Sequence, residues 1–138
     1  MNRFINYAHR GASDYAPENT MSAFRKAIEL KANGIELDLQ KTKDGKIVIF
    51  HDDFIDKKSN GIGTISDYTY NELLKFDFGS WFDLKYKDEK IVLFEEFAKK
   101  FLSEDLTFAI ELKTIGIEKQ TLEIIDKYSK SKENIYIT

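Results

Sequence analysis

Two carboxylates stand two residues apart inside an apolar run, Glu36 and Asp38 among Ile35, Leu37 and Leu39. Alternate side chains of a β-strand point to opposite faces, so both acids would lie on one face and the three aliphatic side chains on the other. Two neighbouring carboxylates repel each other and resist burial. A divalent cation with oxygen ligands would hold them together. The pattern therefore predicts a hard-cation site on this strand.

Further chemically active residues follow other predicted strands. His9 and Arg10 come directly after the first strand, His51 after a strand over residues 46–50, and Glu111 and Lys113 at the end of a strand over residues 107–112. In parallel α/β folds, functional side chains gather at the carboxyl ends of the strands. The spacing therefore allows all these side chains to meet the paired acids in one reaction centre.

Strands and helices alternate along the chain, which indicates a parallel α/β fold. Strands are expected over residues 4–8, around Glu36, and over 46–50, 107–112 and 134–138. Helices are expected from Asn19 or Thr20 to Asn33-Gly34, where glycine would supply the left-handed exit, and over 94–102 and 117–128. The expected core-facing positions are Ala23, Phe24, Ala27 and Ile28; then Phe94, Phe97, Ala98 and Phe101; then Leu122, Ile124 and Ile125.

The stretch over residues 53–90 breaks this alternation and is predicted to be an insertion, with a short helix over 70–76. A turn at Lys43-Asp44-Gly45 would fold the strand over 46–50 back on the paired-acid strand. Trp81 and Phe82 are expected to pack in the core or within the insertion rather than to line the mouth of the site. The Lys57-Lys58 pair is expected to be solvated surface.

Bulk composition restricts the class of protein. The chain has 138 residues, a formal net charge of −3 and no cysteine. A chain of this length forms one domain with a real core. The lysines are spread among acids rather than gathered in a basic stripe, so nucleic acid is not an expected partner. The sequence shows neither a signal peptide nor a membrane span, and a cytoplasmic protein is the expectation.

The motifs as a set resemble the glycerophosphodiester phosphodiesterase family. They are His9-Arg-Gly with Pro17-Glu-Asn-Thr20, the paired-acid strand with Thr42-Lys-Asp-Gly45, His51-Asp52, and Ile110-Glu-Leu-Lys113. They agree with the family in type, order and spacing from residue 3 to the end. The resemblance implies a TIM (β/α)8 barrel and metal-dependent hydrolysis of glycerophosphodiesters to glycerol 3-phosphate and an alcohol.

The resemblance also implies a role for each site residue. Glu36, Asp38 and Glu111 would bind the cation, Mg²⁺ or Ca²⁺, for which three carboxylates are suitable ligands. His9 and His51 would form the acid-base pair, because histidine titrates near neutral pH. Arg10 and Lys113 would hold the substrate phosphate. Asp52 would either orient His51, join the metal shell or serve the structure. Pro17, Glu18 and Asn19 are expected to shape the first loop.

Two features depart from the family. Lys57-Lys58-Ser59 stands where the family usually has Arg-Thr-Thr, and the usual proline near Val92 is absent, which puts substrate preference in question. A complete barrel needs about 250 residues and eight strands. Residues 1–138 therefore correspond to an N-terminal portion of the barrel that includes the insertion 53–90. Its open edge would favour a homo-oligomer.

Three alternatives remain on sequence grounds. The chain could be the phosphodiesterase itself, or a lysophospholipase D or sphingomyelinase D type relative with the same site logic. It could instead be a catalytically incomplete half-barrel that self-associates or binds a partner.

Overall fold

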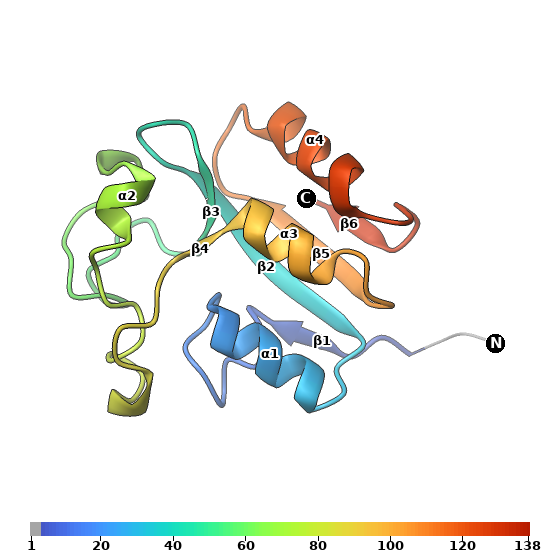
Figure 1. Ribbon diagram of the computed structural model, residues 1–138, viewed down its shortest axis with the longest axis horizontal. Helices are drawn as coiled ribbons and strands as arrows, with labels where there is room; N and C mark the ends of the chain where they lie inside the picture. The colour runs from blue at the N-terminus through green and yellow to red at the C-terminus, as the bar shows by residue number, and fades with distance from the viewer. Residues whose placement is uncertain (1–3) are drawn as a thin grey trace.

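The strand with the paired acids lies at the centre of the sheet in the computed structural model, which describes residues 4–138 (Figure 1). This strand, β2 (Gly34–Lys41), is parallel to β1 (Tyr7–His9) and to β5 (Thr107–Leu112), and β5 is parallel to β6 (Ile135–Ile137). The turn at Gly45 (φ 81°) folds β3 (Ile47–Ile49) back antiparallel on β2, as predicted. Strand β4 (Val92–Leu93) pairs with β3 and forms the outer edge there.

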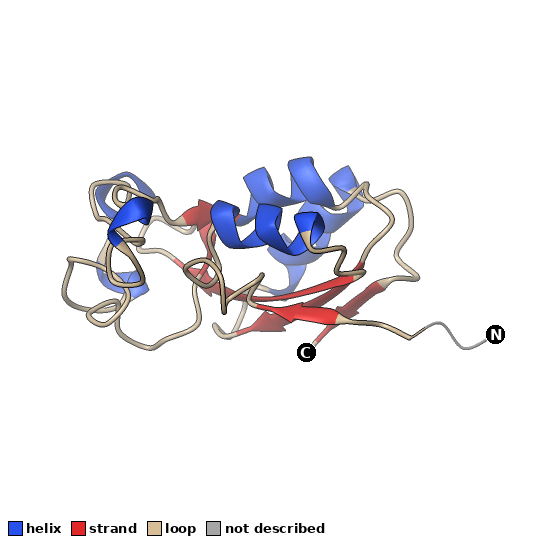
Figure 2. Cartoon of the chain, turned by 90° about the horizontal axis from the view of Figure 1, so that it is seen from below, coloured by secondary structure: helices blue, strands red, loops and turns tan. Residues whose placement is uncertain are grey.

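Three helices cover one face of this sheet (Figure 2). They are α1 (Met21–Glu29), α3 (Phe94–Phe101) and α4 (Glu118–Tyr128). The aliphatic residues of β2, Ile35, Leu37 and Leu39, are fully buried in the core beneath them. Each such side chain contributes about 1.5–3 kcal/mol on burial. The same alternation turns Glu36 and Asp38 away from the helices, toward the site.

Helix α1 begins as predicted and ends earlier. The Thr20 hydroxyl accepts a hydrogen bond from the Ala23 N–H and caps the helix. The helix ends at Glu29, and the left-handed residue after it is Lys31 (φ 63°), so the predicted exit at Gly34 is wrong. Gly34 instead starts β2. A Cβ there would lie 2.7 Å from Cδ1 of Tyr7, so glycine is needed for the close approach of β1.

The predicted helix faces are mostly confirmed. All four predicted core residues of α3 are buried. In α1, Ile28 is 39% exposed, and in α4, Leu122 is 47% exposed, so both of these assignments are wrong. Thr121 takes the inward position on α4, four residues before the buried Ile125. Successive helical residues are about 100° apart around the axis, which carries Leu122 out of the core.

Residues 53–90 form a separate lobe beside the sheet (Figure 1). The lobe contains the short helices η1 (Ile65–Asp67), α2 (Tyr70–Leu73) and η2 (Leu84–Tyr86). Helix α2 is shorter than the predicted 70–76. A second apolar cluster joins this lobe to β3, formed by Val48, Phe50, Ile55, Ile65, Leu73, Phe78 and Ile91.

The sheet does not close into a barrel. The four parallel strands β1, β2, β5 and β6 lie side by side, and within residues 4–138 no helix covers the face that carries Glu36 (Figure 2). Tyr7 and Tyr136 are partly exposed, 39% and 54%.

In the described part of the chain, no helix is long and apolar enough to span a bilayer.

Candidate metal centre and active site

The register of the sheet brings the predicted acids together. In the parallel pairing of β1 with β2, His9 lies directly beside Glu36, and in that of β2 with β5, Glu111 lies beside Asp38. One carboxylate oxygen from each of Glu36, Asp38 and Glu111 lies within 4.8 Å of the other two. Paired residues on parallel strands share a face, so the three predicted metal ligands form one cluster at the carboxyl end of the sheet.

Like charge and burial perturb the three carboxyls. Burial, followed by repulsion from Asp38, raises the pKa of Glu36 to about 7. Burial also raises the pKa of Asp38. The pKa of Glu111 is lowered, first by its contact with the neighbouring Asp38 carboxyl and then by Lys113, whose Nζ lies 3.5 Å from Glu111 Oε1. Burial thus shifts two of the three carboxyls toward the protonated form in the absence of a cation.

Asp38 provides a direct test of whether a cation fits. Its Oδ2 accepts a hydrogen bond of 3.0 Å from Nδ2 of Asn19. Its Oδ1 is buried and receives no hydrogen bond from any described residue. An unpaired buried carboxylate oxygen is costly. A cation would satisfy it, and an all-carboxylate donor set suits Mg²⁺ or Ca²⁺ better than the softer transition metals. The residues present therefore fit a hard divalent cation.

The loop after β1 places Arg10 over the same acids. Arg10 adopts a left-handed backbone (φ 58°), which directs its N–H to Glu36 Oε2 at 3.1 Å. Its Nε lies 3.7 Å from Asp38 Oδ2. The next residue, Gly11, has φ 80°, and a Cβ there would lie 2.8 Å from Ala23 of α1. The loop can therefore pack against α1 only with glycine at this position.

The two histidines come from different strands, since His9 ends β1 and His51 follows β3. His51 Nδ1 lies 2.8 Å from Asp52 Oδ1. An ionised carboxylate only accepts hydrogen bonds, so Nδ1 carries the hydrogen and Nε2 of a neutral His51 is left as an acceptor. His9 Nε2 lies 3.7 Å from Glu36 Oε2, and its side chain is 65% exposed. Of the roles considered for Asp52, this contact supports the orientation of His51.

Glu18 and Asn19 contact residues of the candidate site, whereas the sequence predicted only that they shape the first loop. Besides Asn19, Glu18 contacts the site, because its carboxylate pairs with Arg10 Nη1 at 3.2 Å. Lys58 is not solvated surface as predicted, since its Nζ pairs with Glu18 Oε1 at 3.0 Å. The sequence carries a signal for Glu18 and Asn19, because both are polar residues in the loop that follows the carboxyl end of a strand. A lysine in the insertion carries no such signal.

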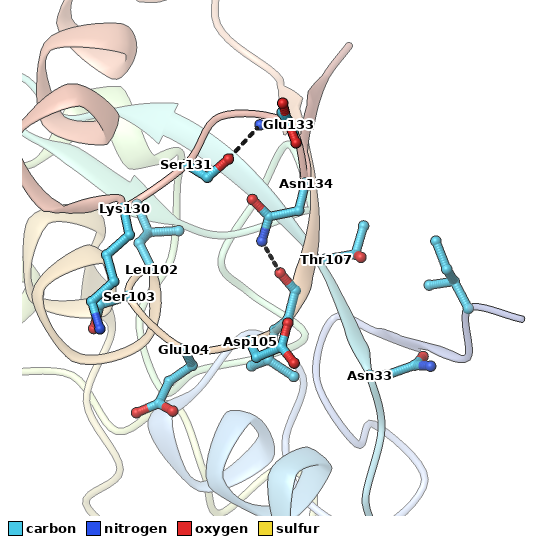
Figure 3. A pocket seen from close by; sticks show the side chains of 12 residues that line it. Asn33, Leu102, Ser103, Glu104, Asp105, Thr107, Lys130, Ser131, Glu133 and Asn134 are labelled. Atoms are coloured by element: carbon cyan, nitrogen blue, oxygen red, sulfur yellow. Dashed lines mark hydrogen bonds between the residues drawn. The ribbon is translucent and has the colours of Figure 1, made fainter. Parts of the chain in front are cut away.

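Two cavities lie at opposite ends of the sheet. One of about 630 Å³ is lined by His51, Asp52, Asp53, Phe54, Asp56, Lys57 and Lys113, and so opens beside the candidate site. The other, of about 520 Å³, lies at the amino ends of the strands (Figure 3). There Asn134 donates to the Leu106 carbonyl, and the Glu133 N–H donates to the Ser131 hydroxyl at 3.2 Å. None of the predicted site residues lines this second cavity.

Known proteins resemble this chain in sequence and in fold. Residues 9–136 match the glycerophosphoryl diester phosphodiesterase family. The chain is 41% identical over 127 residues to a glycerophosphodiester phosphodiesterase of Caldanaerobacter subterraneus subsp. tengcongensis, over 88% of this chain and 52% of that relative.

Solved structures agree in fold. A glycerophosphodiester phosphodiesterase from Agrobacterium tumefaciens superposes with a TM-score of 0.91 at 26% identity, over 99% of this chain and 58% of that one. An Oleispira antarctica phosphodiesterase in complex with the product sn-glycerol-3-phosphate superposes with a TM-score of 0.85 at 31% identity, over 95% and 55%. The chain thus has the fold of about half of the TIM barrel of these proteins, with an open sheet, and spans about half the length of the relatives it matches. It belongs to the glycerophosphoryl diester phosphodiesterase family.

Proposed function

We propose that the protein hydrolyses glycerophosphodiesters to glycerol 3-phosphate and an alcohol, with Mg²⁺ or Ca²⁺ as cofactor. One observation carries this proposal: Glu36, Asp38 and Glu111 converge beside His9 in a chain of this family. These three carboxylates would hold the cation, which supplies a Lewis acid that polarises the phosphoryl group.

Arg10 and Lys113 bind the substrate phosphate. Their cationic groups contact different acids, with Arg10 Nε 3.7 Å from Asp38 Oδ2 and Lys113 Nζ 3.5 Å from Glu111 Oε1. A guanidinium and an ammonium in these positions can donate to different phosphate oxygens. The contacts with the acids also keep both long side chains oriented toward the site before substrate arrives.

His9 and His51 transfer the protons. The contact with Asp52 keeps His51 in the tautomer whose Nε2 can accept a proton from the nucleophile. His9, whose Nε2 lies 3.7 Å from Glu36 Oε2, would then protonate the leaving oxygen. Such a division between two positioned histidines is the usual form of general acid-base catalysis near neutral pH.

A coupled assay for glycerol 3-phosphate tests the proposal. The chain is incubated with glycerophosphocholine, with and without EDTA, and then with Mg²⁺ or Ca²⁺ restored. We expect release that EDTA abolishes and a divalent cation restores. A folded chain that releases no glycerol 3-phosphate with either cation would refute the proposed activity.

The uncovered face of the sheet supports a second candidate function, a self-associating module. Tyr7 and Tyr136 are partly exposed, and β6 lies at the edge of the parallel sheet. Such an edge offers unpaired backbone groups to another chain. A homo-oligomer would cover this face. Light scattering at micromolar concentration is expected to give at least twice the monomer mass; a monomer with full diesterase activity would exclude this candidate.

A further inference from the structure

Lys58 brings a charge from the lobe 53–90 to the edge of the candidate site. Its Nζ lies 3.0 Å from Glu18 Oε1 and 4.1 Å from the centroid of the Trp81 ring. Only 23% of the Lys58 side chain is exposed. An ammonium over an indole face is attracted by the ring quadrupole, so Trp81 holds the lysine in the position from which it reaches Glu18.

Glu18 shares its carboxylate between two cations. Its Oε1 and Oε2 lie 3.4 and 3.2 Å from Nη1 of Arg10, and Oε1 also accepts the hydrogen bond from Lys58. The Glu18 side chain is 13% exposed, so solvent screens these charges only in part. Glu18, Arg10 and Lys58 together carry a formal net charge of +1.

This surplus charge matters for Arg10. A carboxylate paired with Arg10 alone would neutralise the guanidinium and compete with a phosphate for it. Lys58 offsets that negative charge, so that Glu18 can orient Arg10 without cancelling its attraction for an anion. We propose that Lys58 is a positioning residue that acts through Glu18 to set the phosphate affinity of Arg10. The proposal rests on the proposed function, in which Arg10 binds the substrate phosphate.

The same contacts argue against a different use of this cluster. Ligand atoms of Glu18, His51 and Asp52 also lie within 4.8 Å of one another, an arrangement that resembles a second metal site. Glu18, however, is already paired with two cations, and Asp52 is paired with His51. The group is therefore occupied by protein charges, and the role of Lys58 lies in the balance of charge around Arg10.

Substrate kinetics separate positioning from chemistry. Lys58→Met keeps a long side chain over Trp81 and removes the charge, and Lys58→Arg restores it. For Lys58→Met we expect KM for glycerophosphocholine, and Kd for glycerol 3-phosphate with Mg²⁺, to rise about tenfold with kcat within about twofold. Lys58→Arg should recover most of the loss. Unchanged KM and Kd, or a loss in kcat alone, would overturn the proposal.

Lys85 supplies a matched control. It lies in the same lobe with its Nζ 5.2 Å from the Tyr86 ring centroid, and it makes no ion pair within the described residues. Lys85→Met therefore removes the same charge and a similar ring contact without touching Glu18. We expect this variant to keep the parent KM and Kd. A rise equal to that of Lys58→Met would show a general effect of net charge and overturn the proposal.

A spectroscopic measurement tests the linkage without activity. The chain has only three arginines, Arg3, Arg10 and Arg25, so their Nε–Hε signals can be assigned in ¹⁵N NMR spectra. We expect the Arg10 signal to shift in Lys58→Met and to stay in place in Lys85→Met. An Arg10 signal that does not respond to Lys58→Met would refute the linkage. A shifted signal in a chain that binds no phosphate would support the linkage and refute the proposed function.

Discussion

The side-chain amide of Asn19 donates a hydrogen bond of 3.0 Å to Oδ2 of Asp38, and both residues are buried. Asn19 belongs to the loop after β1, and Asp38 lies on β2. The bond engages Oδ2 of Asp38 while Oδ1 has no hydrogen-bond partner, so the loop orients a central carboxylate. A group that orients a metal ligand in this way influences both the geometry of a metal site and its affinity for the ion.

Removal of the Asn19 amide should weaken metal binding. Asn19 has φ 56°, so Asn19→Gly removes the side chain and keeps a residue that tolerates this backbone. We expect Ca²⁺ affinity, measured by calorimetry, to fall about 10–100-fold. Thermal unfolding without metal provides the control for folding. Parent affinity in a folded Asn19→Gly variant would contradict the role assigned to the amide.

The raised pKa of Glu36 predicts how the metal-free chain responds to pH. An ordinary glutamate titrates near pH 4.3, whereas burial and Asp38 raise the pKa of Glu36 to about 7. Between these values the folded state binds more protons than the unfolded state, so the free energy of unfolding should fall as pH rises to about 7. Urea unfolding in EDTA measures this slope.

Glu36→Gln is the matched variant for that experiment. It keeps the size of the side chain and removes its titration, so the decline in stability between about pH 4.3 and 7 should become shallower. Adding Ca²⁺ to the parent should likewise offset the loss near pH 7, because a cation binds the ionised form. The same slope in parent and variant would show that Glu36 does not titrate in this range.

His51 and Asp52 should differ in their effect on rate. We expect His51→Ala to lower kcat for glycerophosphocholine by about 10²–10⁴-fold, the usual contribution of a positioned acid or base. Asp52→Asn should cause a smaller loss, because it disturbs the tautomer of His51 and leaves the imidazole in place. Calorimetry with Mg²⁺ serves as the control. A drop in metal affinity at unchanged turnover would place His51 in the coordination shell instead.

The convergence of the three carboxylates could be predicted because strand alternation fixes which side chains share a face. The alternation of side chains along β2 places Glu36 and Asp38 on one face, and the parallel register of β5 with β2 places Glu111 beside Asp38. The exit of α1 was mispredicted because Lys31 takes the left-handed position that glycine usually occupies. Lys58 was missed because its partners, Glu18 and Trp81, come from distant parts of the chain and leave no local pattern.

A calorimetric titration of the metal-free chain with Ca²⁺, repeated with Mg²⁺, tests the central claim most directly. The account predicts one site per chain, with binding abolished or weakened at least tenfold by Glu36→Gln and by Asp38→Asn. Glu123→Gln, an exposed change on α4, removes the same charge at a distance and should leave binding unaltered. Binding as tight in Glu36→Gln and Asp38→Asn as in the parent, or no binding by the folded parent, would contradict the assignment of Glu36, Asp38 and Glu111 as the metal centre.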